Sequence, residues 1–205
     1  MKIKRFILGE LQTNCYVIEC EKDFIVVDPG FEDQSLYDYL TGLDKVAKYL
    51  LLTHNHYDHV SGAYRVKELF PDINTVMHRE DAENMNNSVL TGEVVFSRNI
   101  KKFNLDILAE HKQTIEFNEH KIILYHTPGH TAGSMSIQLE NIIFTGDVLF
   151  RGSIGRCDLP TGDINKLCRS LEFYYSLGQN FDIYPGHGEY TTLNNEKSTR
   201  DYFCK

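Results

Sequence analysis

The sequence predicts a mixed α/β protein in which two β-sheets pack face to face and helices cover their outer faces, giving four layers (αββα). Two observations predict this fold. Strand-like segments dominate each half of the chain and helical segments follow them, and the two halves show a weak twofold similarity that is consistent with an internal duplication. At 205 residues the chain is long enough for one large domain with an ample core. We therefore expect a single domain over residues 1–205.

The first half of the chain alternates apolar strand-like runs with helical patterns. Pro29-Gly30 ends the third strand, Ser35 is the expected N-cap of the first helix, and Pro71 stops the second helix. The predicted elements are strands over 3–8, 14–19 and 24–28, a helix over 35–43, a strand over 46–53, a helix over 60–70, a strand over 75–78 and a polar helix ending at 87.

Residues 88–104 mix one glycine, several charges and a few apolar residues without a clear period. Loops of this length in a compact domain tend to be lids or binding loops, so we expect this segment to cover the site. Asp163 is the expected N-cap of the last helix. The predicted elements after the loop are strands over 105–108, 114–117, 121–127, 134–139 and 142–145, a helix over 163–177 and a strand over 181–184.

Charge and hydropathy exclude two classes of partner. The formal net charge of −8 argues against a general binder of phosphate backbones, so we expect no nucleic-acid partner. No apolar run approaches the ~20 residues that cross a bilayer, and Met1 to Arg5 lead into a strand instead of a signal-peptide core. We expect a soluble, cytoplasmic protein without a membrane partner, and the sequence does not predict its oligomeric state.

The cysteines predict reduced thiols. There are five of them, an odd number, and none forms a CxxC pair. We therefore expect no disulfide framework and a reducing compartment. Cys15 and Cys20 are expected within or at the edge of a strand, whereas Cys157 lies near the second group of motifs described below.

Four potential metal ligands follow the apolar run 49–52, namely His54, His56, Asp58 and His59. Imidazole nitrogen and carboxylate oxygen suit zinc, iron or manganese, and no nearby cysteine favours a purely structural thiolate site. Residues two apart on an extended chain point the same way. We therefore expect His54, His56 and Asp58 to share one side and His59 to point elsewhere, so that this stretch can serve two metals.

Three further ligand candidates lie where the pattern predicts strand ends. His130 follows Thr127-Pro128-Gly129, Asp147 follows Thr145-Gly146, and His187 follows Pro185-Gly186. Together with the first group they form a coherent set of seven metal-ligand candidates.

The other histidines receive less specific interpretations. His78, His111 and His120 have no ligand-type neighbours at a useful spacing, so we expect surface or loop residues. His126 is expected either to donate a hydrogen bond near the site or to pack in the core. Tyr57, inside the motif, is expected to wall the pocket.

The set His54-x-His56-x-Asp58-His59, His130, Asp147 and His187 resembles the signature of the metallo-β-lactamase superfamily over essentially the whole chain. The segments 127–131 and 145–150 are most similar to the glyoxalase II-like (hydroxyacylglutathione hydrolase-like) group. The resemblance implies an αββα sandwich with the site at one edge, between the sheets. It also implies a pair of metals, the first held by His54, His56 and His130, the second by Asp58, His59 and His187, with Asp147 bridging both. β-Lactamases of the superfamily commonly have a cysteine where Asp147 stands, which counts against antibiotic hydrolysis.

Such a site has a defined chemistry. Two divalent cations about 3.5 Å apart lower the pKa of a shared water until hydroxide is available near neutral pH, and they polarise a substrate carbonyl. A thioester suits this chemistry because a thiolate leaves readily. We therefore expect a dinuclear hydrolase that acts on a small-molecule thioester of the S-lactoylglutathione type, with Asp58 and Asp147 as catalytic carboxylates. The expected cofactors are two divalent metal ions, zinc first, with iron or manganese as alternatives.

Substrate recognition is less defined. Arg156 stands where the glyoxalase II-like group has a substrate-binding lysine, and its guanidinium can bind a carboxylate through a bidentate fork; the alternative is an ordinary ion-paired surface arginine. Asp158 stands where that group has a tyrosine. The chain ends shortly after His187, so we expect a short form without the C-terminal helical domain that helps to bind glutathione.

Two other functions remain open. The stretch Gly155-Arg156-x-Asp158 also resembles persulfide dioxygenases, which would hold a single iron through His54, His130 and Asp147. The third function is a metal-stabilised binding protein without turnover. The open set of ligands without cysteine counts against it, because structural zinc sites are usually closed tetrahedra.

Overall fold

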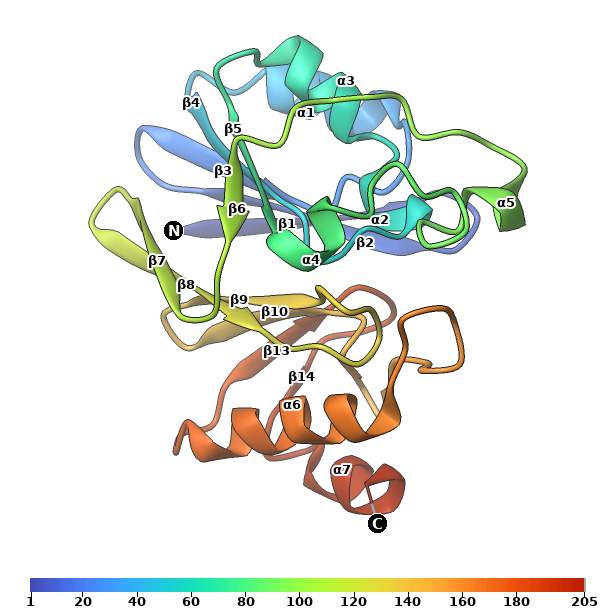
Figure 1. Cartoon of the computed structure of the whole chain (residues 1–205). Helices are drawn as coiled ribbons and strands as arrows, with labels where there is room; N and C mark the ends of the chain where they lie inside the picture. The colour runs from blue at the N-terminus through green and yellow to red at the C-terminus, as the bar shows by residue number, and fades with distance from the viewer. Residues whose placement is uncertain (205) are drawn as a thin grey trace.

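The computed structural model describes residues 1–204 and confirms the four-layer sandwich (Figure 1). Two six-stranded sheets face each other. The helices α1 (Gln34–Thr41) and α3 (Ala63–Leu69) lie outside the first sheet, and α6 (Ile164–Ser176) and α7 (Lys197–Phe203) lie outside the second. Among residues 1–204, no helix is both long and apolar enough to span a bilayer.

The first sheet has the strand order β1-β2-β3-β4-β5-β6. Its strands are β1 (Lys2–Leu8), β2 (Thr13–Glu19), β3 (Asp23–Val27), β4 (Val46–Leu51), β5 (Asn74–His78) and β6 (Ile107–Ala109). The first three strands pair antiparallel, and β3 to β6 pair parallel. The parallel strands direct their carboxyl ends to one edge of the sheet, where the site forms.

The second sheet has the strand order β14-β13-β10-β9-β8-β7. Its strands are β7 (Gln113–Phe117), β8 (His120–His126), β9 (Met135–Leu139), β10 (Ile142–Gly146), β13 (Asp182–Pro185) and β14 (Thr191–Thr192). An antiparallel run from β7 to β10 is followed by the parallel pair β10–β13, which α6 connects. The first sheet follows the same plan, in which α1 connects the parallel pair β3–β4. Two short strands, β11 (Leu149–Phe150) and β12 (Ser153–Ile154), form a separate hairpin.

Three apolar clusters hold the layers together. The cluster between the sheets includes Tyr16, Leu51 and Phe144, whose rings and aliphatic chains are almost fully buried. The second cluster packs the first sheet against α1 and α3, and the third packs the second sheet against α6 through residues such as Leu167 and Leu171. Burial of apolar surface on both faces of each sheet is the main stabilising term of this architecture.

Three helix predictions need correction. The first helix begins after Asp33, whose carboxylate accepts a hydrogen bond from the Leu36 amide, so Asp33 and not Ser35 is the N-cap. The helix predicted over 60–70 is interrupted at Ser61-Gly62 and forms α2 (Tyr57–Val60) and α3. The polar helix predicted to end at 87 is a single turn, α4 (Arg79–Ala82).

The loop 88–104 contains a further turn of helix, α5 (Glu93–Phe96), which projects from the body of the molecule (Figure 1).

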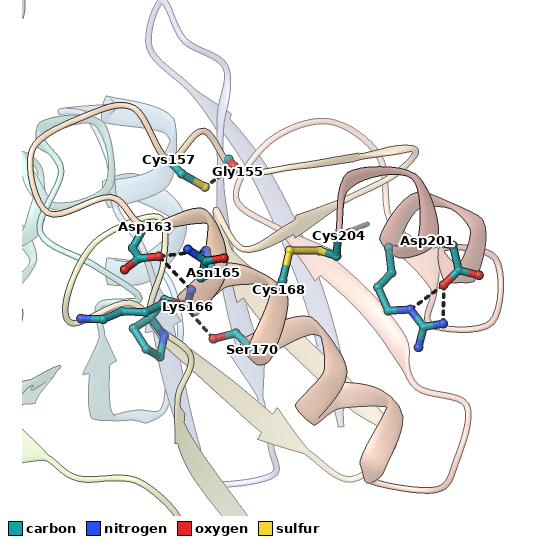
Figure 2. Close-up of a disulfide and its surroundings, with 11 residues drawn as sticks. Gly155, Cys157, Asp163, Asn165, Lys166, Cys168, Ser170, Asp201 and Cys204 are labelled. Carbon is teal, nitrogen blue, oxygen red and sulfur yellow. Dashed lines mark hydrogen bonds and ion pairs between the residues drawn. A yellow bond between two sulfur atoms is a disulfide. The ribbon is translucent and has the colours of Figure 1, made fainter.

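The prediction of reduced thiols is wrong for two cysteines. Cys168 on α6 and Cys204 after α7 form a disulfide, as Figure 2 shows. Their Cα atoms lie 5.4 Å apart, within the usual range for a disulfide. Cys15, Cys20 and Cys157 are free. Cysteine count and local spacing could not reveal this pair, because its members are 36 residues apart in sequence and meet only through the packing of α7 on α6.

Candidate metal centre

Four loops carry the candidate ligands to one edge of the sandwich. They follow β4, β8, β10 and β13, and each leaves the carboxyl end of its strand. The first loop enters α2 at Tyr57, so Asp58 and His59 lie in a helical turn and not on an extended chain. The expectation that Asp58 shares a side with His54 and His56 is therefore wrong, because the helical turn places Asp58 beside His59.

The first group of converging side chains is His54, His56 and His130, all buried. The Nδ1 atom of His56 lies 3.1 Å from Nε2 of His54 and 2.9 Å from Nε2 of His130. Nitrogens from two separate loops therefore face a common point.

The second group is Asp58, His59 and His187. The Nε2 atom of His187 lies 3.3 Å from Nε2 of His59 and 3.3 Å from Oδ2 of Asp58. Asp147 lies between the two groups. Its Oδ1 is 3.3 Å from Nε2 of His59, and its Oδ2 is 3.6 Å from Nε2 of His130 and 3.5 Å from Nε2 of His187. The structure thus brings all seven candidate ligands together.

Outer hydrogen bonds orient four of the imidazoles. In each, the Nδ1 atom faces an oxygen that accepts its proton: Oγ1 of Thr53 for His54, a carboxylate oxygen of Asp28 for His59, the Arg156 carbonyl for His130 and the Leu11 carbonyl for His187. The Thr53 hydroxyl donates its own proton to Asp28, so it must accept from His54. When these rings are neutral, each Nε2 therefore presents a lone pair to the centre.

This donor set fits divalent cations. The lone pairs of the imidazole nitrogens and the carboxylate oxygens face inward. These electron-rich atoms repel one another unless cations or protons lie between them. Oδ1 of Asp147 is buried and has no hydrogen-bond partner within residues 1–204. An orphaned buried carboxylate oxygen is costly, and a metal ion would satisfy it. The histidines and carboxylates are ligand types for zinc, iron or manganese.

The carboxylates dominate the electrostatics of the second group. Burial opposes a charged His187, but its hydrogen bonds to Asp147 and Asp58 raise its pKa to about 9. Burial also opposes a charged His59, yet Asp147, Asp58 and Asp28 hold its pKa well above the usual value. In the first group, burial and the neighbouring His130 lower the pKa of His56 to about 3. Burial likewise holds the pKa of His54 well below its usual value. The centre thus has a cation-attracting side next to the neutral imidazoles of His54 and His56.

Sequence reasoning missed two carboxylates that hold the site in shape. Asp28, at the end of β3, accepts hydrogen bonds from the Thr53 amide and hydroxyl and from His59. Asp81 accepts from the Asn55 amide, the Thr131 hydroxyl and the Gly133 amide, which joins the loops that carry the first ligand group. The sequence predicts Asp28 only as the last residue of the strand over 24–28, before Pro29-Gly30. Its role depends on a hydrogen bond to His59, 31 residues away, and no local sequence pattern reveals that contact.

Two glycines are required by the close packing of the site. A Cβ atom at Gly186 would lie 2.3 Å from Oδ1 of Asp147. A Cβ atom at Gly155 would lie 1.7 Å from the backbone oxygen of Asp147. Both positions exclude a side chain because Asp147 fills the space.

Tyr57 and the loop 88–104 lie next to the centre. The Tyr57 amide donates to the Thr91 carbonyl at 2.7 Å, and its ring stacks on Phe96 of α5 with centroids 4.8 Å apart. Tyr57 and Lys101 both line a cavity of about 270 Å³. The loop is thus joined to the helical turn that carries Asp58 and His59. Its role as a lid stays a prediction.

The interpretation of His78 as a surface or loop residue is wrong. His78 is 4% exposed at the end of β5, and its ring stacks on His126 with centroids 3.8 Å apart and planes 11° apart. Glu80 lies near both rings, so these three side chains form another group of potential ligands. Because the rings of His78 and His126 are nearly parallel, their nitrogen lone pairs do not point to a common metal position. We therefore interpret the stacked pair as a packing contact.

His78 should make the protein sensitive to acid. Burial and His126 lower the pKa of His78 to about 4, below its value of ~6.5 in an unfolded chain. Between these two values the unfolded state binds the extra proton, so stability falls as the pH falls through this window. We expect His78→Gln to reduce the loss of unfolding free energy between pH 7 and 5 by about 1 kcal/mol, allowing for solvent screening.

Urea unfolding at the two pH values measures this difference. Lys121→Gln, an exposed change that does not titrate in the window, is the control. Equal pH dependence in His78→Gln and the control variant would show that His78 is not the group responsible.

Comparison with known proteins gives a consistent family. A family model of the metallo-beta-lactamase superfamily matches residues 8–187. The hydroxyacylglutathione hydrolase GloC of Haemophilus influenzae is 32% identical, over 98% of this chain and 98% of its own length.

Two solved structures are similar over nearly the whole chain. The crystal structure of BLEG-1 B3 metallo-beta-lactamase has a TM-score of 0.91 and 30% identity, covering 100% of both chains. The crystal structure of TTHA1623 in a di-iron-bound form has a TM-score of 0.84 and 31% identity, covering 97% of this chain and 99% of that one. The family match over residues 8–187 and the match of BLEG-1 to the whole chain include all four loops of the candidate centre.

Proposed function

The chain belongs to the metallo-β-lactamase superfamily and is a metal-dependent hydrolase, and we propose that it cleaves a thioester of the S-lactoylglutathione (hydroxyacylglutathione) type. The observation that carries this proposal is the convergence of seven ligand-type side chains in two groups with Asp147 between them. The similarity to GloC along almost the full length of both proteins supports the substrate class.

Each residue has a defined task in this proposal. His54, His56 and His130 would hold one divalent cation, Asp58, His59 and His187 a second, and Asp147 both. When bound, two such cations supply an activated water and a polarised carbonyl. Asp28, through His59, and the carbonyls of Arg156 and Leu11, through His130 and His187, keep the imidazoles oriented for this purpose. The remaining requirement is a place for the thiol portion of the substrate.

Arg156 is the candidate for binding the thiol portion of the substrate. Its guanidinium makes two 2.8 Å hydrogen bonds to Asp158, and both side chains are exposed, at 61% and 69%. An exposed ion pair contributes little stability, so a substrate carboxylate can replace Asp158 at the fork. Arg156 borders an open surface depression of about 690 Å³ that none of the seven candidate ligands lines, and its backbone carbonyl accepts a hydrogen bond from His130, which connects this surface to the metal centre. We therefore propose that Arg156 binds a carboxylate of the substrate.

Elemental analysis together with turnover assays tests the proposal. We expect close to two metal ions per chain, zinc first, and release of free thiol from S-lactoylglutathione. Protein that holds two metals but releases no thiol from this or related acylated peptide thiols would contradict the thioesterase proposal while leaving the metal centre in place.

Two alternatives are tested in the same experiment. Hydrolysis of a β-lactam is the second candidate because BLEG-1 is a B3 metallo-beta-lactamase at 30% identity, and a chromogenic cephalosporin is its probe. A persulfide dioxygenase with one iron would instead consume oxygen when supplied with a persulfide. Iron remains an alternative metal because TTHA1623 has a di-iron-bound form. The ratio of turnover among the three substrates identifies the activity.

A further inference from the structure

A small pocket lies beside α6, outside the metal centre, and its chemistry is different. It has a volume of about 190 Å³. It is lined by His111, His126, Pro128, Lys166, Arg169, Ser170 and Phe173. Pockets for whole organic ligands usually exceed ~300 Å³, so this one fits a small ion or the end group of a larger molecule.

The pocket is built on one face of α6. Lys166, Arg169, Ser170 and Phe173 follow the spacing i, i+3, i+4 and i+7, which places them in one row on the helix surface. Figure 2 shows the Lys166 side chain extending away from the Cys168–Cys204 disulfide. The row therefore faces the end of β8 and the turn after it, not α7.

The permanently charged residues that line this pocket are cationic, and a carboxylate lies nearby, since Oε1 of Glu80 is 3.9 Å from Nε2 of the lining His126. Lys166 and Arg169 are the lining residues with permanent charge, and no carboxylate lines the pocket among residues 1–204. Nζ of Lys112 adds a third cation, 5.9 Å from the centroid of the Phe173 ring. In the part of the chain that the structure describes, the Lys166 and Arg169 side chains form no ion pair, whereas basic residues such as Lys67 and Arg79 pair with carboxylates.

The other polar groups of the lining already form hydrogen bonds within the protein, which leaves recognition to these two cations. The ring of His126 donates from Nε2 to the Ala132 carbonyl at 2.8 Å, and the Ser170 hydroxyl donates to the Pro128 carbonyl at 2.8 Å. His111 bonds to the backbone of His126. The free donors are therefore the Arg169 fork, which matches two oxygens of an oxyanion, and the Lys166 ammonium.

We propose that this pocket binds an oxyanion, either free inorganic phosphate or the terminal group of a phosphomonoester. An anion between Lys166 and Arg169, which are neighbours at i and i+3 on α6, relieves the repulsion of their two charges, and the exposure of both side chains makes this attraction dependent on ionic strength. The site does not depend on the thioester chemistry proposed above. Its occupant would contact Pro128, two residues before the candidate ligand His130, on the side of the turn that faces α6.

Calorimetric titration of the zinc-loaded protein with inorganic phosphate and with phenyl phosphate tests this site. We expect Arg169→Ala and Lys166→Ala each to weaken binding by at least about tenfold, because each removes a charge-assisted contact. Both side chains are exposed, so both variants should fold. Lys121→Ala, an exposed lysine on the same strand as His126, should bind as the wild type does. Binding of both probes identifies an end-group site, and binding of phosphate alone identifies a site for the free ion.

Imidazole NMR signals locate the bound anion, because phosphate can also bind to metal ions. We expect the signals of His111 and His126 to shift on titration in the wild type and not in Arg169→Ala. Wild-type affinity in the Arg169→Ala and Lys166→Ala variants, or shifts confined to the histidines of the metal centre, would overturn the proposal.

Discussion

Replacing Asp147 with alanine is expected to lower thioester turnover by at least about a thousandfold, the scale seen when a central member of a catalytic unit is lost. Asp147 has one carboxylate oxygen beside His59 and the other beside His130 and His187. Without this carboxylate the two ligand groups no longer share a residue. Measurement of kcat/KM and of metal content should show both quantities falling, with metal content below two ions per chain.

The fold should survive the change, because the core clusters do not include Asp147. Asp182→Ala is a matched control, since this aspartate begins β13 in the same sheet and bonds to Asn141 away from the centre. The control should keep wild-type metal content and turnover. Turnover of Asp147→Ala at the wild-type rate would remove Asp147 from the mechanism, and a loss of far-ultraviolet circular dichroism would mean that the variant reports on folding and not on chemistry.

The strands that carry the site were predictable because their signal is local. β4, β8 and β10 are apolar runs that end at glycine, proline or a polar ligand, and the structure places each within a few residues of its predicted position. Short elements escaped prediction. β11, β12 and β14 have two residues each, too few for a period to emerge, and α7 lacks a strong apolar stripe.

The candidate ligands were predictable for a different reason. Seven histidines and aspartates follow the ends of only four strands, and such a concentration of ligand-type residues indicates a metal site. Their supporting partners were not. Asp28, Asp81 and the carbonyl of Leu11 act through hydrogen bonds to residues far away in sequence, and a carbonyl carries no sequence signal at all. The burial of His78 likewise depends on its stacking with His126 across the two sheets. Contacts of this kind appear only when the chain has folded.

The Cys168–Cys204 disulfide is expected to stabilise the folded protein strongly. Cys204→Ser is expected to lower the free energy of unfolding by about 3 to 4 kcal/mol, because the bridge constrains a segment of 36 residues in the unfolded chain. For a chain of this size that loss corresponds to a fall in Tm of about 6 to 15 °C. The start of α7 should stay in place, since buried Glu196 accepts hydrogen bonds from the Thr191 and Thr199 hydroxyls and the Gly152 amide. Thermal unfolding with and without a thiol reductant measures the effect.

Cys157→Ser is the matched control, because Cys157 is a partly buried free cysteine that packs against the same apolar cluster as Cys204. The reductant should lower the Tm of the wild type and of Cys157→Ser by the same amount and leave that of Cys204→Ser unchanged. Titration of the unfolded wild type should detect three thiols before reduction and five after it, matching the free cysteines and the total. Five thiols before reduction would mean that the bridge does not form in the purified protein, and the stability difference between Cys204→Ser and the wild type should then disappear as well.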